Sequence, residues 1–375
     1  MLIVLQSILA YLTGTVLFDV IHYFFHQSMK SQHASLKMLG RLHGMHHRFF
    51  PATLTIQKTL WQENFIRHVT FEYVTQVCGT LFCLFFMHPY AIAFAIIFET
   101  CLFFSVYQWH GEDPHHRSIA KLSAHRGGMF VSGSYHALHH VYPNNFFSSS
   151  IKIIDYVLGT GLQLKGMRIA LTGASGALGS QMKLLLEKAG AVVTPIKFGV
   201  DYDYHDYSRL KSVFANSDIL FLCHGSKHDN AMEANCDSFI QMIELFKSMH
   251  AHRFLPVEIW GVGSEIECHP CFGIKKLYPY AESKRHYARY ARACFRDTSI
   301  QYRHLVHAAF TSRMGPGLMT AKFAANVTMF MLKRGFKYIP VTYTGFAFIN
   351  YFRFILGPTD DEPQRLKTVS QTKKD

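Results

Sequence analysis

The stretch Leu42-His43-Gly44-Met45-His46-His47 decides how the first half of this chain folds, and it has a close counterpart at Tyr135-His136-Ala137-Leu138-His139-His140. Each stretch reads His-x-x-His-His. On a helix, positions i, i+3 and i+4 share one face, so each stretch directs three imidazoles toward one point. A third stretch, Asp19 to His26, places His22 and His26 one helical turn apart. The three stretches therefore predict helical faces that converge on a shared metal centre.

Histidine is concentrated in this half of the chain. Of the 24 histidines, 15 precede residue 141 and 9 follow it. Neutral imidazole is a strong ligand for iron, copper and zinc. Many partly buried imidazoles in one place would be costly in desolvation and mutual repulsion unless a metal held them neutral and paired. The alternative is a structural or pH-sensing role for these histidines.

The apolar segments around the histidines favour a membrane protein. The chain has 375 residues, 49% of them hydrophobic and only 17% charged, which is low in charge for a wholly soluble protein. Met1 to Phe18 carries no charge, and it lacks the basic start and the cleavage site of a signal peptide. A second apolar region, Phe71 to Trp109, is long enough for two spans with a turn near His88-Pro89. This hairpin would bring all the histidine stretches to one side of the bilayer.

Charge and cysteine usage indicate the side of the membrane. The formal net charge is +13, and no nucleic-acid-binding motif is present, so we expect an anionic membrane surface and no nucleic acid as partner. The eight cysteines suggest no disulfide framework, which fits a reducing compartment, and the single Cys268-x-x-Cys271 is a weak zinc signal. Basic residues in the loops predict an integral membrane protein whose active sites face the cytoplasm. These residues are Lys30, Lys37, Arg41, Arg48, Lys58 and Arg67.

Residues 1–165 resemble the fatty acid hydroxylase and sterol desaturase superfamily of membrane di-iron enzymes. The resemblance includes the three histidine boxes, Asn145 and the run Asp155 to Thr160. Gln108-Trp109-His110 stands where many members carry another ligand, while His115 and His116 follow a turn and are further candidates. His33, His68, His88 and His125 fit no box, so we expect no ligand role for them. The resemblance implies two Fe ions held by His22, His26, His43, His46, His47, His110, His136, His139 and His140.

The same resemblance implies a reaction. Such enzymes activate O2 at two irons and convert an unactivated C–H bond of a lipid or sterol-like substrate into an alcohol or a double bond. Oxygen activation takes electrons one at a time, and the sequence carries no flavin, haem or iron–sulfur motif that could split a hydride. We therefore expect an external electron carrier of the cytochrome b5 or ferredoxin type.

A second kind of sequence begins after Lys165-Gly166. Met167 to Leu171 reads as a buried strand, Thr172 to Gly179 as a glycine turn followed by a helix to about Ala189, and Ala191 to Ile196 as the next strand. Glycines between a strand and a helix let the backbone approach a pyrophosphate, whose charge the helix N-terminus stabilises. The candidate residues for binding NAD(P) are Thr172, Gly173, Ser175, Gly176, Leu178, Gly179, Lys197, Asp206 and Gly225.

Residues near the second strand bear on which nucleotide is bound. Lys197 ends that strand and could pair with a 2′-phosphate, which favours NADP over NAD; the alternative is an exposed lysine at a strand end. Asp206 is placed to reach the adenine. Asp218 to Leu222 reads as the fourth strand and leads into Gly225.

The catalytic residues of this half follow further along the chain. Tyr280 and Lys284 lie one turn apart on a helix face, and the lysine is expected to lower the pKa of the tyrosine from about 10. With Ser264 they resemble the short-chain dehydrogenase/reductase family over residues 166–320. The resemblance implies that Tyr280 is the acid/base, Lys284 its activator and ribose holder, and Ser264 the carbonyl anchor, with Asn235 as a water-relay residue. The chain departs from the family at 222–225, where Asn-Asn-Ala-Gly is usual.

The sequence thus predicts a two-domain chain. An all-α membrane domain with histidine boxes covers 1–165, and an α/β domain with a doubly wound parallel Rossmann sheet covers 166–335. An interfacial segment and a polar tail cover 336–375, where the segment could instead be a lid on the substrate pocket. The layout resembles bifunctional sterol desaturase/short-chain dehydrogenase proteins, and the histidine boxes also resemble those of plant wax-biosynthesis proteins. The predicted function is a bifunctional lipid oxidoreductase. The alternatives are a fatty aldehyde-processing enzyme of wax or hydrocarbon type, a chain with only one active half, and a metal-storing membrane scaffold.

Overall fold

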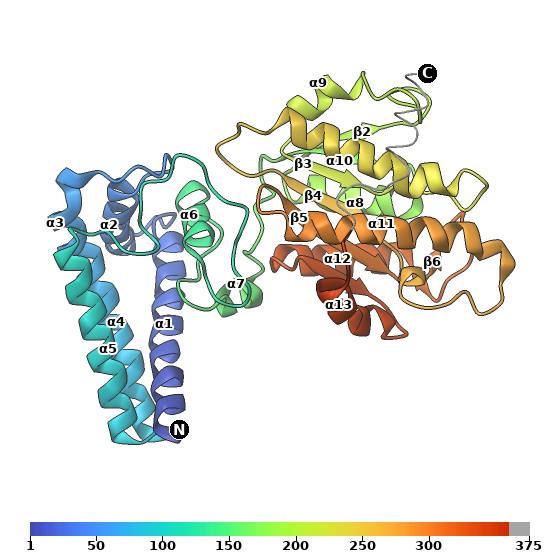
Figure 1. Ribbon diagram of the computed structural model, residues 1–375. Coiled ribbons are helices and arrows are strands. Elements are labelled where there is room, and N and C mark those ends of the chain that lie inside the picture. Colours follow the sequence, from blue (N-terminus) through green and yellow to red (C-terminus); the bar gives the residue numbers. More distant parts are fainter. Residues whose placement is uncertain (360–375) are drawn as a thin grey trace. The chain divides into compact units, whose positions relative to one another are not determined.

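The computed structural model describes residues 1–359 and divides into two compact units, of which the first is Met1–Leu162 and the second begins at Gln163 (Figure 1). The sequence placed this division at 165/166. The polar tail predicted after Pro358 lies, from residue 360 on, outside the described residues.

Three helices form the long part of the first unit: α1 (Leu2–Ser28), α4 (Thr70–Phe82) and α5 (Pro89–Gln108), each packed against the other two (Figure 1). Proline at the first position of α5 suits a helix start, because its missing N–H has no helical partner there. Helices α1 and α4 meet at Gly14, where a Cβ would lie 2.5 Å from the Gln76 carbonyl oxygen. The helical hairpin predicted around His88-Pro89 is therefore present.

The surface of this bundle is largely apolar. Helices α1 and α5 are long and apolar enough to cross a bilayer, a criterion that core helices of soluble proteins also meet. Here only 28% of the most apolar 18-residue stretch of α1, and 22% of that of α5, is buried. Exposed apolar side chains on the three helices include Leu5, Ile8, Leu9, Leu17, Val20, Phe24, Leu81, Phe82, Phe94, Ile97, Phe98 and Phe104.

Shorter elements complete the helical unit. Helix α2 packs against α1, which brings the first His-x-x-His-His stretch beside the His22 and His26 turn. The second such stretch lies on α6. These elements are α2 (Ala34–Phe49), η1 (Lys58–Leu60), α3 (Trp61–Asn64), the π-helical turn η2 (Phe65–Val69), η3 (Cys83–Phe85), α6 (Gly133–Val141) and α7 (Ile153–Leu158).

The second unit is a doubly wound sheet. Six parallel strands lie in the order β2-β1-β3-β4-β5-β8, with α8 and α12 packed together and α9, α10 and α11 forming a second group (Figure 1). Its first, third and fourth strands are almost wholly buried, as parallel strands covered on both faces must be. The strands of this sheet are β1 (Arg168–Thr172), β2 (Val192–Ile196), β3 (Ile219–Leu222), β4 (Glu258–Val262), β5 (Gln301–His307) and β8 (Tyr338–Val341). Two short strands, β6 (Phe310–Thr311) and β7 (Met319–Thr320), lie outside it.

The helices between the strands follow the predicted alternation. They are α8 (Ala177–Lys188), α9 (Leu210–Ala215), the π-helical turn η4 (Glu233–Asp237), α10 (Ser238–Met249), η5 (Glu265–Glu267), η6 (Lys275–Leu277), α11 (Tyr278–Arg296), α12 (Ala321–Lys333) and α13 (Phe346–Leu356).

Two expectations about this sheet were wrong. The strand at 219–222, expected to be the fourth, is the third in the chain, because no strand lies between β2 and it. It nevertheless pairs with β1, so the sheet order reverses between β1 and β3 as a nucleotide site requires. The segment from 336 was expected to lie outside the domain, but β8 pairs with β5 and completes the sheet.

Candidate functional site

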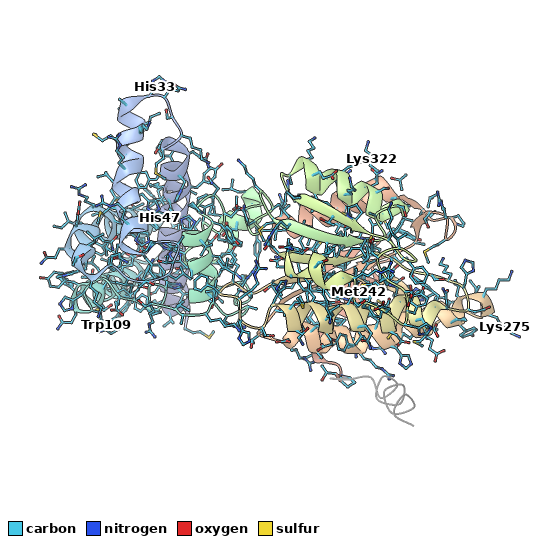
Figure 2. The ribbon with its side chains drawn as sticks, turned by 90° about the horizontal axis from the view of Figure 1, so that it is seen from above. His33, His47, Trp109, Met242, Lys275 and Lys322 are labelled. Atoms are coloured by element: carbon cyan, nitrogen blue, oxygen red, sulfur yellow. The ribbon has the colours of Figure 1, made fainter. Side chains whose placement is uncertain are left out.

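Five histidines of the helical unit form one closed group. His22 and His26 come from α1, His43 and His47 from α2, and His139 from α6. Figure 2 shows His47 inside the unit and His33 at its edge. Going round the ring from His22 through 43, 47, 26 and 139 and back to 22, neighbouring Nε2 atoms are 3.0, 3.1, 3.2, 3.1 and 3.0 Å apart. Ligands about 2.1 Å from one metal ion and at right angles to each other would be about 3.0 Å apart, so the ring has the dimensions of a coordination shell.

A second group of four lies beside it. Its members are His46 of α2, His116 of the following loop, and His136 and His140 of α6. The Nε2 atom of His116 lies 3.0 Å from that of His46 and 3.0 Å from that of His136, and the Nε2 atoms of His136 and His140 are 3.4 Å apart. The four ligand atoms all fall within 4.8 Å of one another. The helical unit thus contains two adjacent sites, each large enough for one ion.

Hydrogen bonds at Nδ1 fix the tautomer of three of these histidines. The Nδ1 atoms of His22, His139 and His140 lie 3.1, 2.8 and 2.6 Å from backbone carbonyl oxygens. A carbonyl oxygen can only accept, so Nδ1 carries the proton and Nε2 presents a bare lone pair. Lone pairs 3.0 Å apart repel each other unless a cation lies between them. The carbonyl groups belong to Phe147, Asn145 and Phe50.

The charge states agree with this geometry. Burial, reinforced by the neighbouring imidazoles, holds the pKa values of His43, His46, His136 and His140 well below the usual range, so these rings are neutral as metal ligands must be. His116 differs, because the Asp113 carboxylate outweighs the effect of burial and raises its pKa. The carboxylate oxygen Oδ2 of Asp113 accepts from His116 Nδ1 at 2.8 Å. The donor set therefore fits two metal ions held by imidazole nitrogen alone.

The structure brings eight of the nine predicted ligands together and replaces the ninth. His110 follows the end of α5, has a φ of 53°, is exposed, and lies with its ring centroid 4.9 Å from that of Trp61, so it joins neither group. His116, six residues on, fills the position. The helix ends at Gln108 and the chain turns away at His110, which the motif could not reveal.

Asn145 and Asp155, which the sequence singled out, support the ligands without binding metal. The buried Asp155 carboxylate accepts from the backbone N–H groups of Phe147 and Ser148, each at 2.9 Å. Asn145 donates its side-chain amide to the carbonyl oxygen of Leu162 at 2.9 Å. Together they fix the loop whose carbonyl groups orient His22 and His139.

His68, for which the sequence predicted no ligand role, contacts both histidine groups. Its side chain is 4% exposed, lies in the π-helical turn η2, and stacks on His46 with ring centroids 3.9 Å apart. Its Nδ1 is 3.3 Å from Nδ1 of His43, and its Nε2 is 3.5 Å from a carboxylate oxygen of Glu72. If Nε2 of His43 faces a metal, its Nδ1–H must donate to His68, whose own N–H then points at Glu72. The sequence feature that could have indicated this role is a histidine and a glutamate four residues apart in an apolar segment.

Replacing His68 by glutamine is expected to weaken metal binding about 10- to 100-fold, because ligand orientation by hydrogen-bonded neighbours has that order of effect. Chelator competition followed by metal analysis would measure it. Glu72→Gln should produce a smaller loss in the same direction, and His33→Gln, at an exposed position, should produce none. Equal metal affinity in His68→Gln and His33→Gln would contradict the assigned role.

A cavity of about 640 Å³ adjoins the histidines. His22, His43, His46, His116 and His136 are among the lining residues, and α1, α4, α5 and neighbouring loops provide most of the others. The volume is that of a typical ligand pocket. A substrate in this cavity would contact members of both histidine groups.

The second unit holds a separate cavity of about 650 Å³ at the glycine turn. Gly173 has a φ of +68°, and a Cβ there would lie 2.7 Å from the Cys223 carbonyl oxygen. A Cβ on Gly179 would lie 2.1 Å from the Gly173 carbonyl oxygen. These two positions require glycine, and helix α8 begins directly after Gly176, so its N-terminus is open to a phosphate group. Of the predicted residues, Gly173, Ser175, Gly176, Leu178, Gly179, Gly225, Ser264, Tyr280 and Lys284 line this cavity.

Three of the predicted nucleotide-binding residues do not line it. Thr172 is buried at the end of β1 and lies 2.7 Å from Nδ1 of His224, so it holds the neighbouring loop. Lys197 is exposed at the end of β2. Asp206 is exposed and accepts from the backbone N–H of Ser208 at 2.8 Å, which caps its own loop instead of facing an adenine.

Tyr280, Ser264 and Lys284 line the same cavity, but their electrostatics differ from the prediction. Burial raises the pKa of Tyr280, and a hydrogen bond from Ser264 only partly opposes this. Lys284 donates to the Val262 carbonyl oxygen at 2.8 Å, and burial lowers its pKa to about 8. The expected lowering of the tyrosine pKa by Lys284 was therefore wrong. The Lys227 ammonium, which the sequence did not single out, lies 5.5 Å from the centroid of the Tyr280 ring.

Asn235 is a positioning residue. It lies in the π-helical turn η4, fully buried, and its side-chain amide donates to the Ser226 carbonyl oxygen at 2.7 Å and to the Ser283 hydroxyl at 3.0 Å. These bonds tie the loop after β3 to the residue next to Lys284. Its carboxamide does not line the cavity, so the structure gives no support for the predicted water relay.

Comparisons with known proteins identify one whole-chain relative. No protein-family model matches the chain. It is 28% identical over 362 residues to monoglucosyldiacylglycerol epimerase of Synechocystis sp. (strain ATCC 27184 / PCC 6803 / Kazusa), an alignment that covers 84% of this chain and 87% of that protein. Because this share exceeds the length of either unit, the likeness includes residues of both.

Solved structures similar to the chain cover about half of it. A short-chain dehydrogenase from Burkholderia cenocepacia in complex with NADP is 15% identical, with 52% of this chain and 95% of that one covered and a TM-score of 0.42. A short-chain dehydrogenase from Sphingobium yanoikuyae in complex with NADPH is 13% identical, with coverage of 52% and 98% and a TM-score of 0.40.

Proposed function

We propose that this chain is a bifunctional membrane oxidoreductase that acts on a lipid. The helical unit holds two iron ions, and the sheet unit uses NAD(P) to interconvert an alcohol and a carbonyl group. The single observation that carries the proposal is the convergence of nine imidazoles in two groups, within each of which the ligand atoms lie within 4.8 Å of one another, with five of the nine lining a ligand-sized cavity. Nitrogen-only ligation fits iron and also copper or zinc, and we choose iron because the three histidine boxes resemble those of membrane di-iron enzymes.

Bound iron would supply activation of dioxygen for attack on an unactivated C–H bond. The protein's own contribution is to hold the ligands. His22, His139 and His140 are oriented by backbone carbonyl groups, and His116 is oriented by Asp113. No flavin, haem or iron–sulfur motif occurs in the sequence, so we propose that an external one-electron carrier serves the irons.

Bound nicotinamide would accept or return a hydride at the substrate carbon. Ser264 hydrogen-bonds the substrate oxygen, and Tyr280 exchanges the hydroxyl proton with it. Because burial raises the pKa of Tyr280, this residue stores a proton at neutral pH and is suited to donate it to a carbonyl oxygen. Lys284, with a pKa of about 8, lines the same cavity and is placed to hold the ribose.

Epimerisation is the second candidate function, favoured by the printed name of the whole-chain relative. The alcohol would lose a hydride from its carbon to the nucleotide and its hydroxyl proton to the phenolate form of Tyr280. The resulting carbonyl compound would then regain both, with the hydride returning to the opposite face of the carbon. No net oxidation results. Such a reaction needs the cavity at Tyr280 to hold one hydroxyl-bearing carbon in two orientations.

Product mass separates the candidates. Purified protein in lipid nanodiscs would be supplied with candidate lipids, NADP and NADPH, and an electron carrier, and the products analysed by mass spectrometry and chromatography. Hydroxylation adds one oxygen atom, desaturation or alcohol oxidation removes two hydrogen atoms, and epimerisation changes retention without changing mass. Net NADPH consumption accompanies carbonyl reduction but not epimerisation. No change in any lipid with both cofactors present would contradict the proposal.

We also propose that the helical unit is embedded in the membrane, with the histidine end at the cytoplasmic face. The apolar side chains that α1, α4 and α5 expose would be costly in water but stable in hydrocarbon. The basic residues lie in the loops that carry or flank the histidine stretches along the chain, so an excess of basic residues at the cytoplasmic face would place the histidines there too. Resistance of the protein to alkaline carbonate extraction would test the embedding.

Lys197 does not line the cavity, but it follows β2, which pairs with β1, and we propose that its exposed side chain reaches a 2′-phosphate there. Replacing Lys197 by alanine is then expected to raise the KM for NADP about tenfold, the effect of losing one charge-assisted hydrogen bond. The KM for NAD should stay unchanged, since NAD carries no such phosphate. Lys188→Ala, at another exposed lysine of this unit, is the matched control. Equal KM values for NADP in the parent and Lys197→Ala would show that the lysine is only a surface residue.

A further inference from the structure

A stripe of polar side chains runs along one face of the helix that carries His68. His68, Glu72, Gln76 and Thr80 recur every fourth residue through η2 and α4, which places them on one side. Gln76 donates to the Glu72 carboxylate at 3.0 Å, and His68 lies 3.5 Å from the same carboxylate. Thr80 donates to Oε1 of Glu99 on α5 at 2.6 Å. The stripe therefore leads from the metal ligands into the apolar part of the bundle.

Glu99 ends the stripe with an acceptor that lacks a donor. Its side chain is 2% exposed, and among the described residues no group hydrogen-bonds its Oε2 atom. Burying a carboxylate oxygen without a donor is costly, and ionisable residues inside a membrane helix bundle usually face a cavity that serves substrate or ions. Glu99 lines the cavity of about 640 Å³ beside the metal groups, so a ligand there could supply the missing donor.

The walls of this cavity are amphiphilic. The lining includes the polar side chains of Asn64, Glu72, Gln76 and Glu99 together with apolar and aromatic side chains. A cavity filled by a hydrocarbon chain alone would leave Oε2 of Glu99 desolvated and without a donor. The apolar wall is formed by Phe18, Val69, Phe98, Leu102, Phe103 and Val106.

We propose that this cavity binds the hydroxyl-rich headgroup of the lipid substrate, with a hydroxyl group donating to Oε2 of Glu99. The ligand class is a polyol or sugar joined to a lipid. The inference rests on the proposed function for the lipid and for the metal groups, and it adds that the part of the substrate presented to the metal side is the polar part. Glu99 is then a specificity-determining residue of the helical unit.

Binding of two matched probes tests this. Full-length protein in phosphatidylcholine nanodiscs would be titrated with octyl glucoside and with 1-methoxyoctane, which share the octyl ether chain and differ in that only the glucoside carries hydroxyl groups. Saturation-transfer NMR would report binding in the parent, Glu99→Leu, Glu99→Gln and the control Glu112→Gln, whose carboxylate is on the surface. Each sample would also be analysed for metal content and for NADP binding.

We expect Glu99→Leu to weaken octyl glucoside binding at least about tenfold while binding of 1-methoxyoctane stays equal or tightens, because the sugar loses its acceptor and the cavity becomes more apolar. Glu99→Gln should give an intermediate loss with normal metal content, which guards against misfolding of the leucine variant. Glu112→Gln should match the parent. A hydrocarbon-binding cavity would instead show equal affinity for both probes, or glucoside binding unaffected by either change at Glu99, and either result would overturn the headgroup site.

The failure of the broader proposal would look different. Loss of metal from the parent protein would remove the metal centre itself, whatever the probes do. Normal metal content and NADP binding combined with no Glu99-dependent glucoside binding would remove only the headgroup site. Glucoside binding that remains in Glu99→Leu but disappears in Ser264→Ala would place the sugar in the sheet unit alone and would also overturn the inference.

Discussion

Replacing His139 by alanine is expected to lower the metal content from about two ions per chain toward one and to reduce any oxygen-dependent turnover by at least about 100-fold. The Nε2 atom of His139 lies within 3.1 Å of those of both His22 and His26, so its loss opens the closed group of five histidines. The second group contains no His139 contact of this kind and should keep its ion. Metal analysis of purified protein, with activity as a second readout, measures both effects.

His110→Ala is the matched control for this change. His110 was predicted as a ligand from its motif, yet its side chain is exposed and outside both groups. The variant should therefore retain both ions. A loss of metal in His110→Ala equal to that in His139→Ala would show that the chain around residue 110 adopts another arrangement when metal is bound.

The second large effect concerns the sheet unit. Tyr280→Phe is expected to lower NAD(P)-dependent turnover of the lipid alcohol or carbonyl by about 10²- to 10⁴-fold, since it removes the group that exchanges the proton. NADP affinity should change little, because the glycine turn and helix α8 remain intact. Steady-state rates and a separate nucleotide titration distinguish the two.

Tyr278→Phe provides the comparison for this variant. Tyr278 begins the same helix and is exposed, so its hydroxyl group has no access to the chemistry. It should behave as the parent. Retention of full turnover in Tyr280→Phe would mean that another group, such as Lys227 or a water molecule, supplies the proton.

The histidine groups could be predicted largely from spacing, because ligands on a helix recur at intervals that a sequence displays directly. The contributions of the irregular segments could not. His116 lies in a loop whose path depends on where α5 ends, and His68 acts through another histidine. The carbonyl groups that orient His22 and His139 belong to a loop that Asp155 holds, which a motif can mark but not explain.

The sheet unit shows the same division. The glycine turn and the first two strands follow from local patterns and were predicted with nearly correct bounds, and the helical spacing expected for Tyr280 and Lys284 is present in α11. The aromatic segment that contains β8 reads equally well as an interfacial element, because only pairing with β5, about 30 residues earlier, makes it a strand. The pKa of Tyr280 is raised by burial, while the Lys284 ammonium donates to the Val262 carbonyl group, and neither follows from the spacing of the two residues.

Metal analysis combined with X-ray absorption at the iron edge, on full-length protein from iron-replete cells, is the most direct test of the central claim. The account predicts about two iron ions per chain, each with nitrogen neighbours at about 2.1 Å and the outer-shell pattern of imidazole. Protein that is correctly folded by its NADP binding but holds no metal, or holds it through sulfur, would contradict it.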